Sequence, residues 1–166
     1  AILETSGLGA LTLEPYANDE IKTLSFAQQR LWFLDQFDAH PALYNIPVAL
    51  KLSGECRLDV LQMCFDNLMQ RHQSLRTTFV ADSEHQSIQK INKDLKCTIS
   101  VSHCNDVAVD DIETTLLEIA NKEVSQSFDL NNGPLIRVKV IEQAVDQWNL
   151  IITLHHIIAD GWSVGI

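Results

Sequence analysis

Apolar residues recur at helical spacing in three stretches of the chain. The first covers residues 25–37, where Ser25 and Gln28 form a capping-box pair at the start of a helix. The second covers 58–71, and the third runs over roughly 110–126. The third stretch is marked by Ile112, Leu116, Ile119 and Glu123. Spacings of three and four residues predict amphipathic helices, each with one face toward a core.

Shorter apolar runs between these helices predict strands. The runs are 44–52, 75–80, 87–91, 98–101, 135–141 and 148–154. Pro47 lies within the first run and favours an edge strand or the start of a strand, because proline donates no hydrogen bond to a neighbouring strand. The last run is almost continuously apolar, which is typical of a strand covered on both faces. The sequence therefore predicts an α/β lobe (α+β, two layers) in which helices pack on a mixed sheet.

The N-terminal stretch differs from the rest of the chain. It combines Gly7, Gly9 and Pro15 with scattered leucines that keep no period. We interpret residues 1–21 as a linker from an upstream domain and residues 22–166 as one folded lobe. A length of 166 residues fits one domain or a large lobe of something bigger.

Composition and charge exclude several classes of function. Apolar residues make up 46% of the chain and charged residues 20%, which is enough to bury a sizeable core. The formal net charge of −10 repels phosphate backbones and anionic lipids. We therefore expect neither a nucleic-acid partner nor a membrane partner. No apolar run in the sequence is long enough to span a bilayer.

The four cysteines, Cys56, Cys64, Cys97 and Cys104, form no C-x-x-C pair. Zinc-ribbon and thioredoxin-like sites are therefore unsupported. Cys64 falls on the apolar stripe of the second predicted helix. We interpret the four residues as buried, reduced thiols of a cytoplasmic protein, in preference to a disulfide framework.

Candidate chemistry gathers where the last predicted strand ends in His155-His156, followed by Asp160 and Gly161. Successive strand side chains point to opposite faces, so one imidazole can meet a cleft while the other packs inside the lobe. Imidazole titrates near pH ~6.5 and suits proton removal from an amine or hydroxyl. Asp160 either holds the loop by an ion pair or orients a histidine, across a tight turn that Gly161 permits.

The same residues also have a purely structural interpretation. In it, both histidines belong to the core and Asp160 caps a helix. A metal site is disfavoured, because the two histidines diverge and no third ligand is close in sequence.

Two further polar clusters occur earlier in the chain. Arg71 and Arg76 lie at the end of the second predicted helix, where they either complement the helix C-terminus and lie in water, or one of them turns inward to pair with a buried acid. Gln28, Gln29 and Arg30 lie on the first predicted helix, where such residues most often form a solvated face.

Taken together, the three clusters resemble the condensation domains of nonribosomal peptide synthetases. The family signature S-x-A-Q-x-R-L-W-x-L is matched by residues 25–34. The signature R-H-E-x-L-R-T-x-F is matched by 71–79, with Gln73 in place of the glutamate. The hallmark H-H-x-x-x-D-G is matched by 155–161, which we call the hallmark segment, and Trp162-Ser163 follow it as in peptide-bond-forming members.

The resemblance implies a chloramphenicol acetyltransferase-like fold, in which two α/β lobes form a V with a tunnel between them. Upstream and downstream peptidyl carrier proteins would present two thioesters on 4'-phosphopantetheine arms, and an adenylation domain would lie nearby. The acceptor amine would attack the donor thioester and form an amide. The domain would need no cofactor of its own and no metal.

The resemblance also assigns roles to individual residues. His156 would act on the acceptor amine, as general base or by positioning it. Asp160 would be structural, in an ion pair with Arg71 or Arg76. Gly161 would supply a backbone amide near the developing oxyanion. The first histidine of the pair would be mainly structural.

The chain stops at Ile166, so the second lobe of such a domain is missing from it. We therefore expect the isolated fragment to be inactive and to self-associate through its exposed apolar face. Two alternatives remain open. One is a coenzyme A-dependent acyltransferase of the same superfamily, and the other is a lobe that docks a carrier protein without chemistry.

Overall fold

The computed structural model describes residues 22–37, 41–84, 86–104 and 107–165. The linker expected at residues 1–21 lies outside the described residues. The three predicted helices are present as α1 (Phe26–Phe37), α2 (Leu58–Arg71) and α3 (Ile112–Val124). Short 3₁₀ turns cover Pro41–Tyr44, Gln73–Arg76, Val109–Asp111 and Ser163–Gly165.

The capping box at the start of α1 forms as predicted. The Ser25 amide donates to Oε1 of Gln28 at 3.0 Å, and the Gln28 amide donates to Oγ of Ser25 at 3.3 Å. These two bonds satisfy main-chain donors that a helix start leaves without partners.

The larger sheet has four strands in the order β2-β7-β6-β5. The strands are β2 (Asn45–Ser53), β5 (Ile99–His103), β6 (Ile136–Ala144) and β7 (Gln147–His155). β5 and β6 run parallel, and the other neighbours are antiparallel, so the sheet is mixed. β2 forms one edge, as Pro47 predicted, and β7 lies between β2 and β6.

A second, smaller sheet has the antiparallel order β1-β4-β3. Its strands are β1 (Lys22–Thr23), β3 (Thr77–Ala81) and β4 (Ser87–Ile91). Leu24 and Phe79 of this region share a buried cluster with Ile157, just beyond β7. The small sheet thereby supports the end of β7 from one side.

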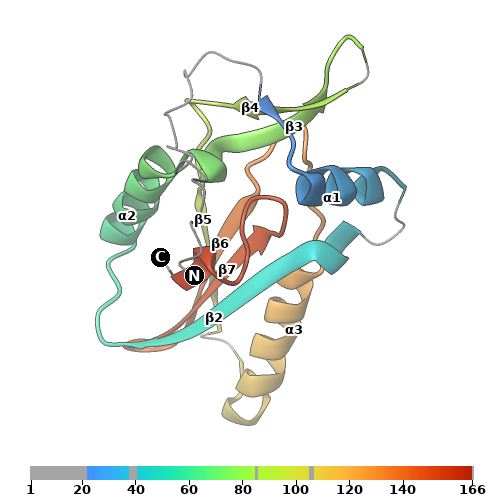
Figure 1. Ribbon diagram of the computed structural model, residues 1–166. Helices are drawn as coiled ribbons and strands as arrows, with labels where there is room; N and C mark the ends of the chain where they lie inside the picture. Colours follow the sequence, from blue (N-terminus) through green and yellow to red (C-terminus); the bar gives the residue numbers. More distant parts are fainter. Residues whose placement is uncertain (1–21, 38–40, 85, 105–106, 166) are drawn as a thin grey trace, which may run out of the picture.

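Helices cover both faces of the larger sheet, so the predicted α/β lobe with helices packed on a mixed sheet is confirmed (Figure 1). α2 packs on the face of β6 that carries Val138 and Val140, through Phe65 and Met69. α3 packs on the opposite face, beside Ile141. This explains the continuous apolar sequence of β7, whose neighbours bury it from both sides.

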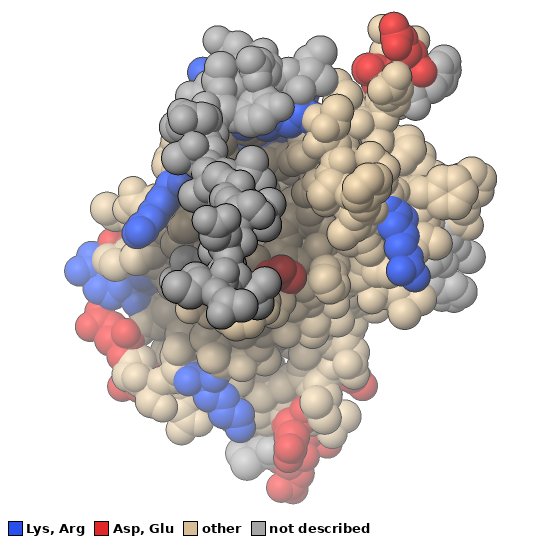
Figure 2. Space-filling view, in the orientation of Figure 1, with Lys and Arg blue, Asp and Glu red and all other residues tan. Residues whose placement is uncertain are grey.

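The face of the molecule in Figure 2 carries separated Lys and Arg side chains, with Asp and Glu mainly toward its edges. None of the helices in the described part of the chain is long and apolar enough to cross a membrane.

The cysteines correct one interpretation of the sequence. Cys64 is exposed, and Cys56 is only partly buried, so the prediction of four buried thiols is wrong. Cys97 and Cys104 are buried, and burial raises the pKa of the Cys97 thiol to about 11. The side chain of Gln62 in α2 donates to the carbonyl of Cys97 and accepts from the Ile99 amide, which connects α2 to the start of β5. All four cysteines are free.

The contribution of the small sheet to stability can be tested at Phe79, whose side chain is fully buried. Replacing Phe79 with alanine leaves a cavity, so we expect the free energy of unfolding to fall by about 3–5 kcal/mol. Phe26→Ala is the matched control, because Phe26 is 91% exposed and its loss should change stability by about 0.5 kcal/mol or less. Urea unfolding followed by circular dichroism measures both changes. Equal effects of the two variants would contradict the packing described.

Candidate active site

The last residue of β7, His155, and the residue after it, His156, lie in opposite environments. The His155 amide donates to the Leu135 carbonyl at 3.0 Å, and the His156 amide donates to the Tyr44 carbonyl at 2.8 Å. These bonds fix the main chain against both neighbouring segments. The imidazole of His155 is 1% exposed, whereas His156 is exposed.

His155 is enclosed by protein. Its Nδ1 accepts a hydrogen bond from the Ile157 amide at 3.1 Å, so Nε2 carries the proton of the neutral ring. The Phe128 ring meets the imidazole edge-on at 6.0 Å between centroids, and the Tyr44 ring lies at 6.3 Å. Burial, with a smaller contribution from the neighbouring His156, lowers the pKa of His155 to about 4. The buried imidazole is therefore neutral at physiological pH.

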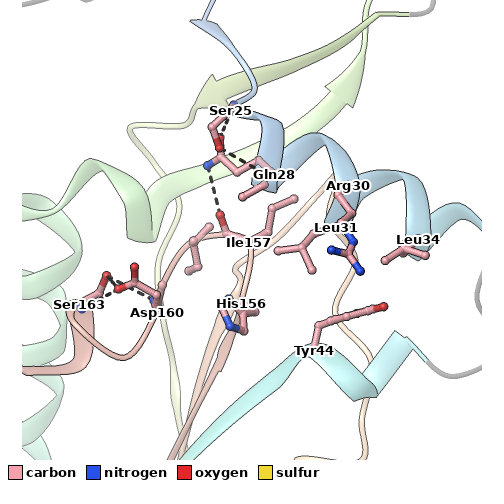
Figure 3. Close-up of a pocket in the computed structure, with 13 residues that line it drawn as sticks. Ser25, Gln28, Arg30, Leu31, Leu34, Tyr44, His156, Ile157, Asp160 and Ser163 are labelled. Atoms are coloured by element: carbon pink, nitrogen blue, oxygen red, sulfur yellow. Dashed lines mark hydrogen bonds between the residues drawn. The ribbon is translucent and has the colours of Figure 1, made fainter.

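His156 lines an open pocket of about 500 Å³ between α1 and the hallmark segment (Figure 3). The lining residues are Ser25, Ala27, Gln28, Arg30, Leu31, Leu34, Tyr44, His156, Ile157, Ile158, Ala159, Asp160 and Ser163. The pocket thus brings together residues of the first signature and of the hallmark segment. A substrate in this pocket would meet an exposed imidazole on a rigid strand end.

Asp160 closes a local turn with Ser163. Its Oδ1 accepts from the Ser163 amide at 2.8 Å and from the Ser163 hydroxyl at 2.6 Å. The hydroxyl in turn accepts from the Asp160 amide at 3.3 Å. The bond from the Ser163 hydroxyl is the main cause that lowers the pKa of the Asp160 carboxyl. The carboxylate therefore acts as a cap on the 3₁₀ turn Ser163–Gly165.

The structure does not bring Asp160 together with Arg71 or Arg76. Among the described residues neither arginine forms an ion pair with it. Arg76 is buried, and its guanidinium donates to the carbonyls of Met69 and Gln70 at the end of α2. Arg71 is exposed in the last turn of the same helix. Arg76 therefore complements the helix C-terminus, as the other interpretation expected, but the expectation that it lies in water is wrong, because its side chain is buried.

Gly161 has no conformational need to be glycine in this structure. Its φ lies outside the left-handed region, and a Cβ built on it would contact nothing within 4 Å. By contrast, Gly54 adopts a φ of +100° directly after β2, where a side chain would be strained. Folding of the chain therefore does not explain the glycine in the hallmark segment.

Gln28 makes a contact that the sequence did not predict. Besides its capping role, its side-chain amide donates to the Ile157 carbonyl at 3.2 Å. This bond joins α1 to the residue that follows His156. The sequence pointed to Gln28 only as a member of the first signature and as the capping partner of Ser25, three residues before it.

The sequence also did not predict that the carboxylate of Glu123 is buried behind the site. Glu123 is 5% exposed and accepts from Arg137 Nε at 2.8 Å, with Lys139 Nζ at 3.8 Å from its other oxygen. The signal was its spacing, because Glu123 continues the stripe of Ile119 on the apolar face of α3. No group of three or more His, Cys, Asp or Glu side chains within the described ranges is arranged to hold a metal ion.

The fold and the pocket define an α/β lobe whose central strand ends in a buried and an exposed histidine beside a capped acidic turn. The family model of the condensation domain matches residues 18–166. The chain therefore belongs to the condensation-domain family.

Curated relatives support this assignment. The chain is 38% identical over 163 residues to a linear gramicidin synthase of Brevibacillus parabrevis, covering 98% of this chain and 3% of that protein. It is 39% identical over 142 residues to a dimodular nonribosomal peptide synthase of Bacillus subtilis, covering 85% of this chain and 6% of that protein. The chain thus spans only a small part of the length of these relatives.

Solved structures show the same fold. The starter condensation domain of rhizomide synthetase RzmA matches with a TM-score of 0.78 at 22% identity, over 86% of this chain and 34% of that one. The four-domain nonribosomal peptide synthetase AB3403 matches with a TM-score of 0.76 at 21% identity, over 95% of this chain and 12% of that one.

The depressed pKa of His155 predicts how stability depends on pH. Below pH 6.5 the imidazole of His155 binds a proton in the unfolded chain, whereas in the folded chain it stays neutral down to about pH 4. The free energy of unfolding should therefore fall by roughly 3 kcal/mol as pH drops through this interval. In His155→Asn, the amide oxygen can replace Nδ1 as acceptor for Ile157, and nothing titrates. Urea unfolding at several pH values should show a shallower decline for the variant. Equal declines would show that His155 is not buried as neutral imidazole.

Proposed function

We propose that this chain is the N-terminal lobe of a condensation domain that forms amide bonds between two carrier-bound substrates. The donor is an aminoacyl or peptidyl thioester, and the acceptor is the amine of an aminoacyl thioester, both on phosphopantetheine arms. The observation that carries the proposal is the division at the end of β7, where His156 faces the open pocket and His155 is buried. The three matching signatures and the named synthases among its relatives support it.

The reaction is an aminolysis of a thioester. The acceptor nitrogen attacks the donor carbonyl carbon, so a C–N bond forms and the carbonyl oxygen becomes an oxyanion. Breaking the C–S bond then gives the amide and releases the donor thiolate. The imidazole of His156 orients the amine, accepts the proton that it loses and returns this proton to the thiolate.

The remaining hallmark residues support that step in different ways. The main-chain amide of Gly161 is the donor proposed for the oxyanion. Absence of a side chain there leaves the amide open to a substrate, since a Cβ would project into free space. Asp160 holds the turn through Ser163, and His155 holds the main chain through Ile157. Arg71 and Arg76 belong to the supporting end of α2.

Large apolar side chains are exposed on α1 and directly after the hallmark segment, and we call them the apolar face, which a second lobe would cover. Phe26, Phe33 and Phe37 of α1 are 91%, 57% and 76% exposed, and Trp162 beside the hallmark segment is 90% exposed. Exposed apolar groups of this size mark an interface. The chain spans 34% of the RzmA domain, which leaves most of such a domain to supply the cover.

The catalytic proposal is tested in a protein that contains this chain together with the second lobe. Donor and acceptor carriers are loaded, and the dipeptidyl thioester is followed by mass spectrometry. Loss of the imidazole in His156→Ala should lower the rate roughly a hundredfold or more. His103→Ala is the control, because His103 lies on the edge strand β5, hydrogen-bonded to Glu142.

Two results would contradict the proposal. Acyl transfer from coenzyme A without any product from carrier pairs would favour a coenzyme A-dependent acyltransferase. Carrier binding without product, in a protein that folds normally, would favour a docking lobe.

The apolar face predicts the behaviour of residues 22–166 made without the second lobe. With α1 uncovered, we expect this fragment to form no amide product and to sediment as a dimer or larger species. Replacing Phe33 and Phe37 with serine should shift the sedimentation velocity toward that of a monomer. An isolated fragment that is monomeric without these changes would show that the face needs no cover.

A further inference from the structure

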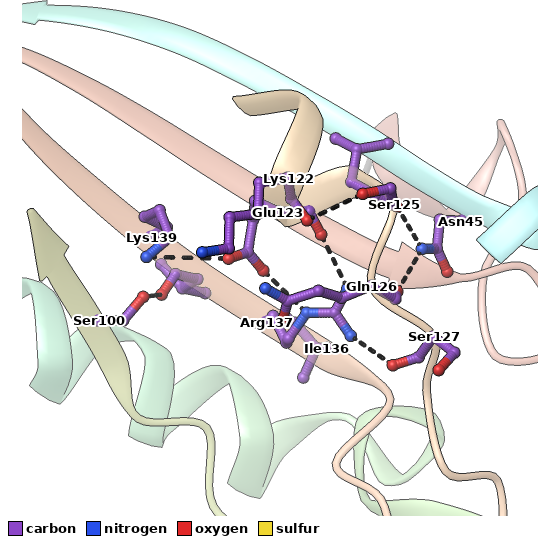
Figure 4. Close-up of polar contacts among 12 residues, drawn as sticks. Asn45, Ser100, Lys122, Glu123, Ser125, Gln126, Ser127, Ile136, Arg137 and Lys139 are labelled. Carbon is purple, nitrogen blue, oxygen red and sulfur yellow. Dashed lines mark hydrogen bonds and ion pairs between the residues drawn. The ribbon is translucent and has the colours of Figure 1, made fainter. Parts of the chain in front are cut away.

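The C-terminal end of α3 is tied to the larger sheet by side chains of two strands (Figure 4). Arg137 of β6 donates to the carbonyls of Glu123, Gln126 and Ser127 at 3.0, 2.8 and 3.2 Å. Asn45 of β2 donates to the carbonyls of Val124 and Gln126 at 2.6 and 2.8 Å. A helix leaves its last carbonyls without partners, and these side chains supply them. The segment 123–127 is therefore fixed to the sheet.

The guanidinium of Arg137 is also the partner of a buried charge. Its Nε donates to the Glu123 carboxylate, whose side chain is 6% exposed, while that of Arg137 is 22% exposed. A lone charge at such a position would be strongly destabilising, whereas a paired and fully hydrogen-bonded one is tolerated. Hydrogen bonds to one carboxylate and three carbonyls thus set the position of Arg137.

The same guanidinium stacks on the ring of Phe128, with Cζ 3.8 Å from the ring centroid. The ring in turn meets the imidazole of His155 edge-on. Phe128 also belongs to the buried cluster that contains Ile157. Phe128 is therefore held by Arg137 and touches residues on both sides of His156.

His155 connects Phe128 to the main chain of the hallmark segment. Its Nδ1 accepts from the Ile157 amide, and the Ile157 carbonyl accepts from Gln28. The peptide group between His156 and Ile157 is thus held by His155, and the next peptide group is held by Gln28 of α1, whose bond to the Ile157 carbonyl is drawn in Figure 3.

We propose that Arg137 is a positioning residue for the site: it fixes Phe128 against His155, and this contact keeps the imidazole of His156 correctly oriented in the pocket. The proposal rests on the proposed function, because it concerns the orientation of the group that acts on the amine. Neither Arg137 nor Phe128 lines the pocket, so both act through other residues.

The arrangement also keeps His155 neutral. Among the described residues, the ion pairs on this side of the sheet join Glu123 of α3 to Arg137 and Lys139 of β6. Asn45 of β2 contributes an uncharged amide, and Tyr44 and His156 lie beside the imidazole. Displacing Phe128 admits water and raises the pKa of His155 toward its ordinary value. Protonated Nδ1 can no longer accept from the Ile157 amide, so the site loses its orientation in mildly acidic solution.

The experiment uses the two-lobe protein and four variants. Arg137→Lys keeps the positive charge but loses the planar guanidinium that donates to several carbonyls at once. Phe128→Leu removes the aromatic contact and leaves Arg137 in place. The double variant tests the connection between them, and Arg57→Lys is the control, because Arg57 pairs with Asp59 on the exposed start of α2.

Single-turnover rates with loaded carriers are measured across pH, at several acceptor concentrations. We expect Arg137→Lys and Phe128→Leu each to lower the maximal rate roughly tenfold or more, with unchanged half-saturation by the acceptor. The double variant should be no slower than the slower single variant, because both changes remove one chain of contacts. The loss should deepen below about pH 6.5, the ordinary range of imidazole. Arg57→Lys should match the parent protein.

The proposal would be overturned if the rate loss of the double variant equalled the product of the two single losses. A normal rate in a folded Arg137→Lys protein would also overturn it. Nuclear magnetic resonance of ¹⁵N-labelled histidine supplies a readout that does not depend on activity. In Arg137→Lys the pKa of His155 should rise, and an unchanged titration would also overturn the proposal. If the parent protein makes no amide, the proposed function fails, while this titration still decides whether Arg137 fixes His155.

Discussion

The pairing of β7 with β2 and β6 determines where each histidine lies. β7 is hydrogen-bonded on both sides, and its register with β2 runs without interruption from Asn45–His155 to Ser53–Gln147. In a strand the side chains alternate between faces, so a slip of one residue would bury His156 and expose His155. The chemistry of the pocket therefore depends on pairing along the whole length of a strand.

The two sides of that strand end differ in their physical character. Toward α1 the support is mainly apolar, with Leu31 and Trp32 packed against the cluster of Ile157. Toward α3 it includes the charged group around Glu123, which a low-dielectric interior tolerates only when it is fully paired. Apolar packing has no preferred direction, whereas the hydrogen bonds of a buried ion pair fix the orientation of the side chains that form them. The α3 side is thus the more restrictive of the two for the orientation of the histidines.

The sequence predicted most of the fold and the division of the histidines, because both follow from local periodicity. Helix ends, the edge position of β2 and the buried β7 agree with the structure within a few residues. Contacts at long range were less accessible. Asp160 was expected to meet a distant arginine, but Ser163, three residues away, occupies its carboxylate. Cys64 was placed on a buried stripe because the borders of a helical stripe are indistinct. Glu123 was placed on the apolar stripe of α3, but its burial depends on Arg137 and Lys139, which β6 supplies from a distant part of the sequence.

The turn closed by Asp160 and Ser163 has a mechanical consequence. Its side-chain bonds lie within four consecutive residues, so they tie the turn to itself and not to a neighbouring strand or helix. The histidines, in contrast, are anchored to the segments beside β2 and β6 through their amides. Ile158 and Ala159 join this turn to the histidines, and both pack into the core cluster of α2 and the larger sheet. The carboxylate of Asp160 is thus satisfied inside its own turn, and the apolar packing of these two residues connects that turn to the rest of the lobe.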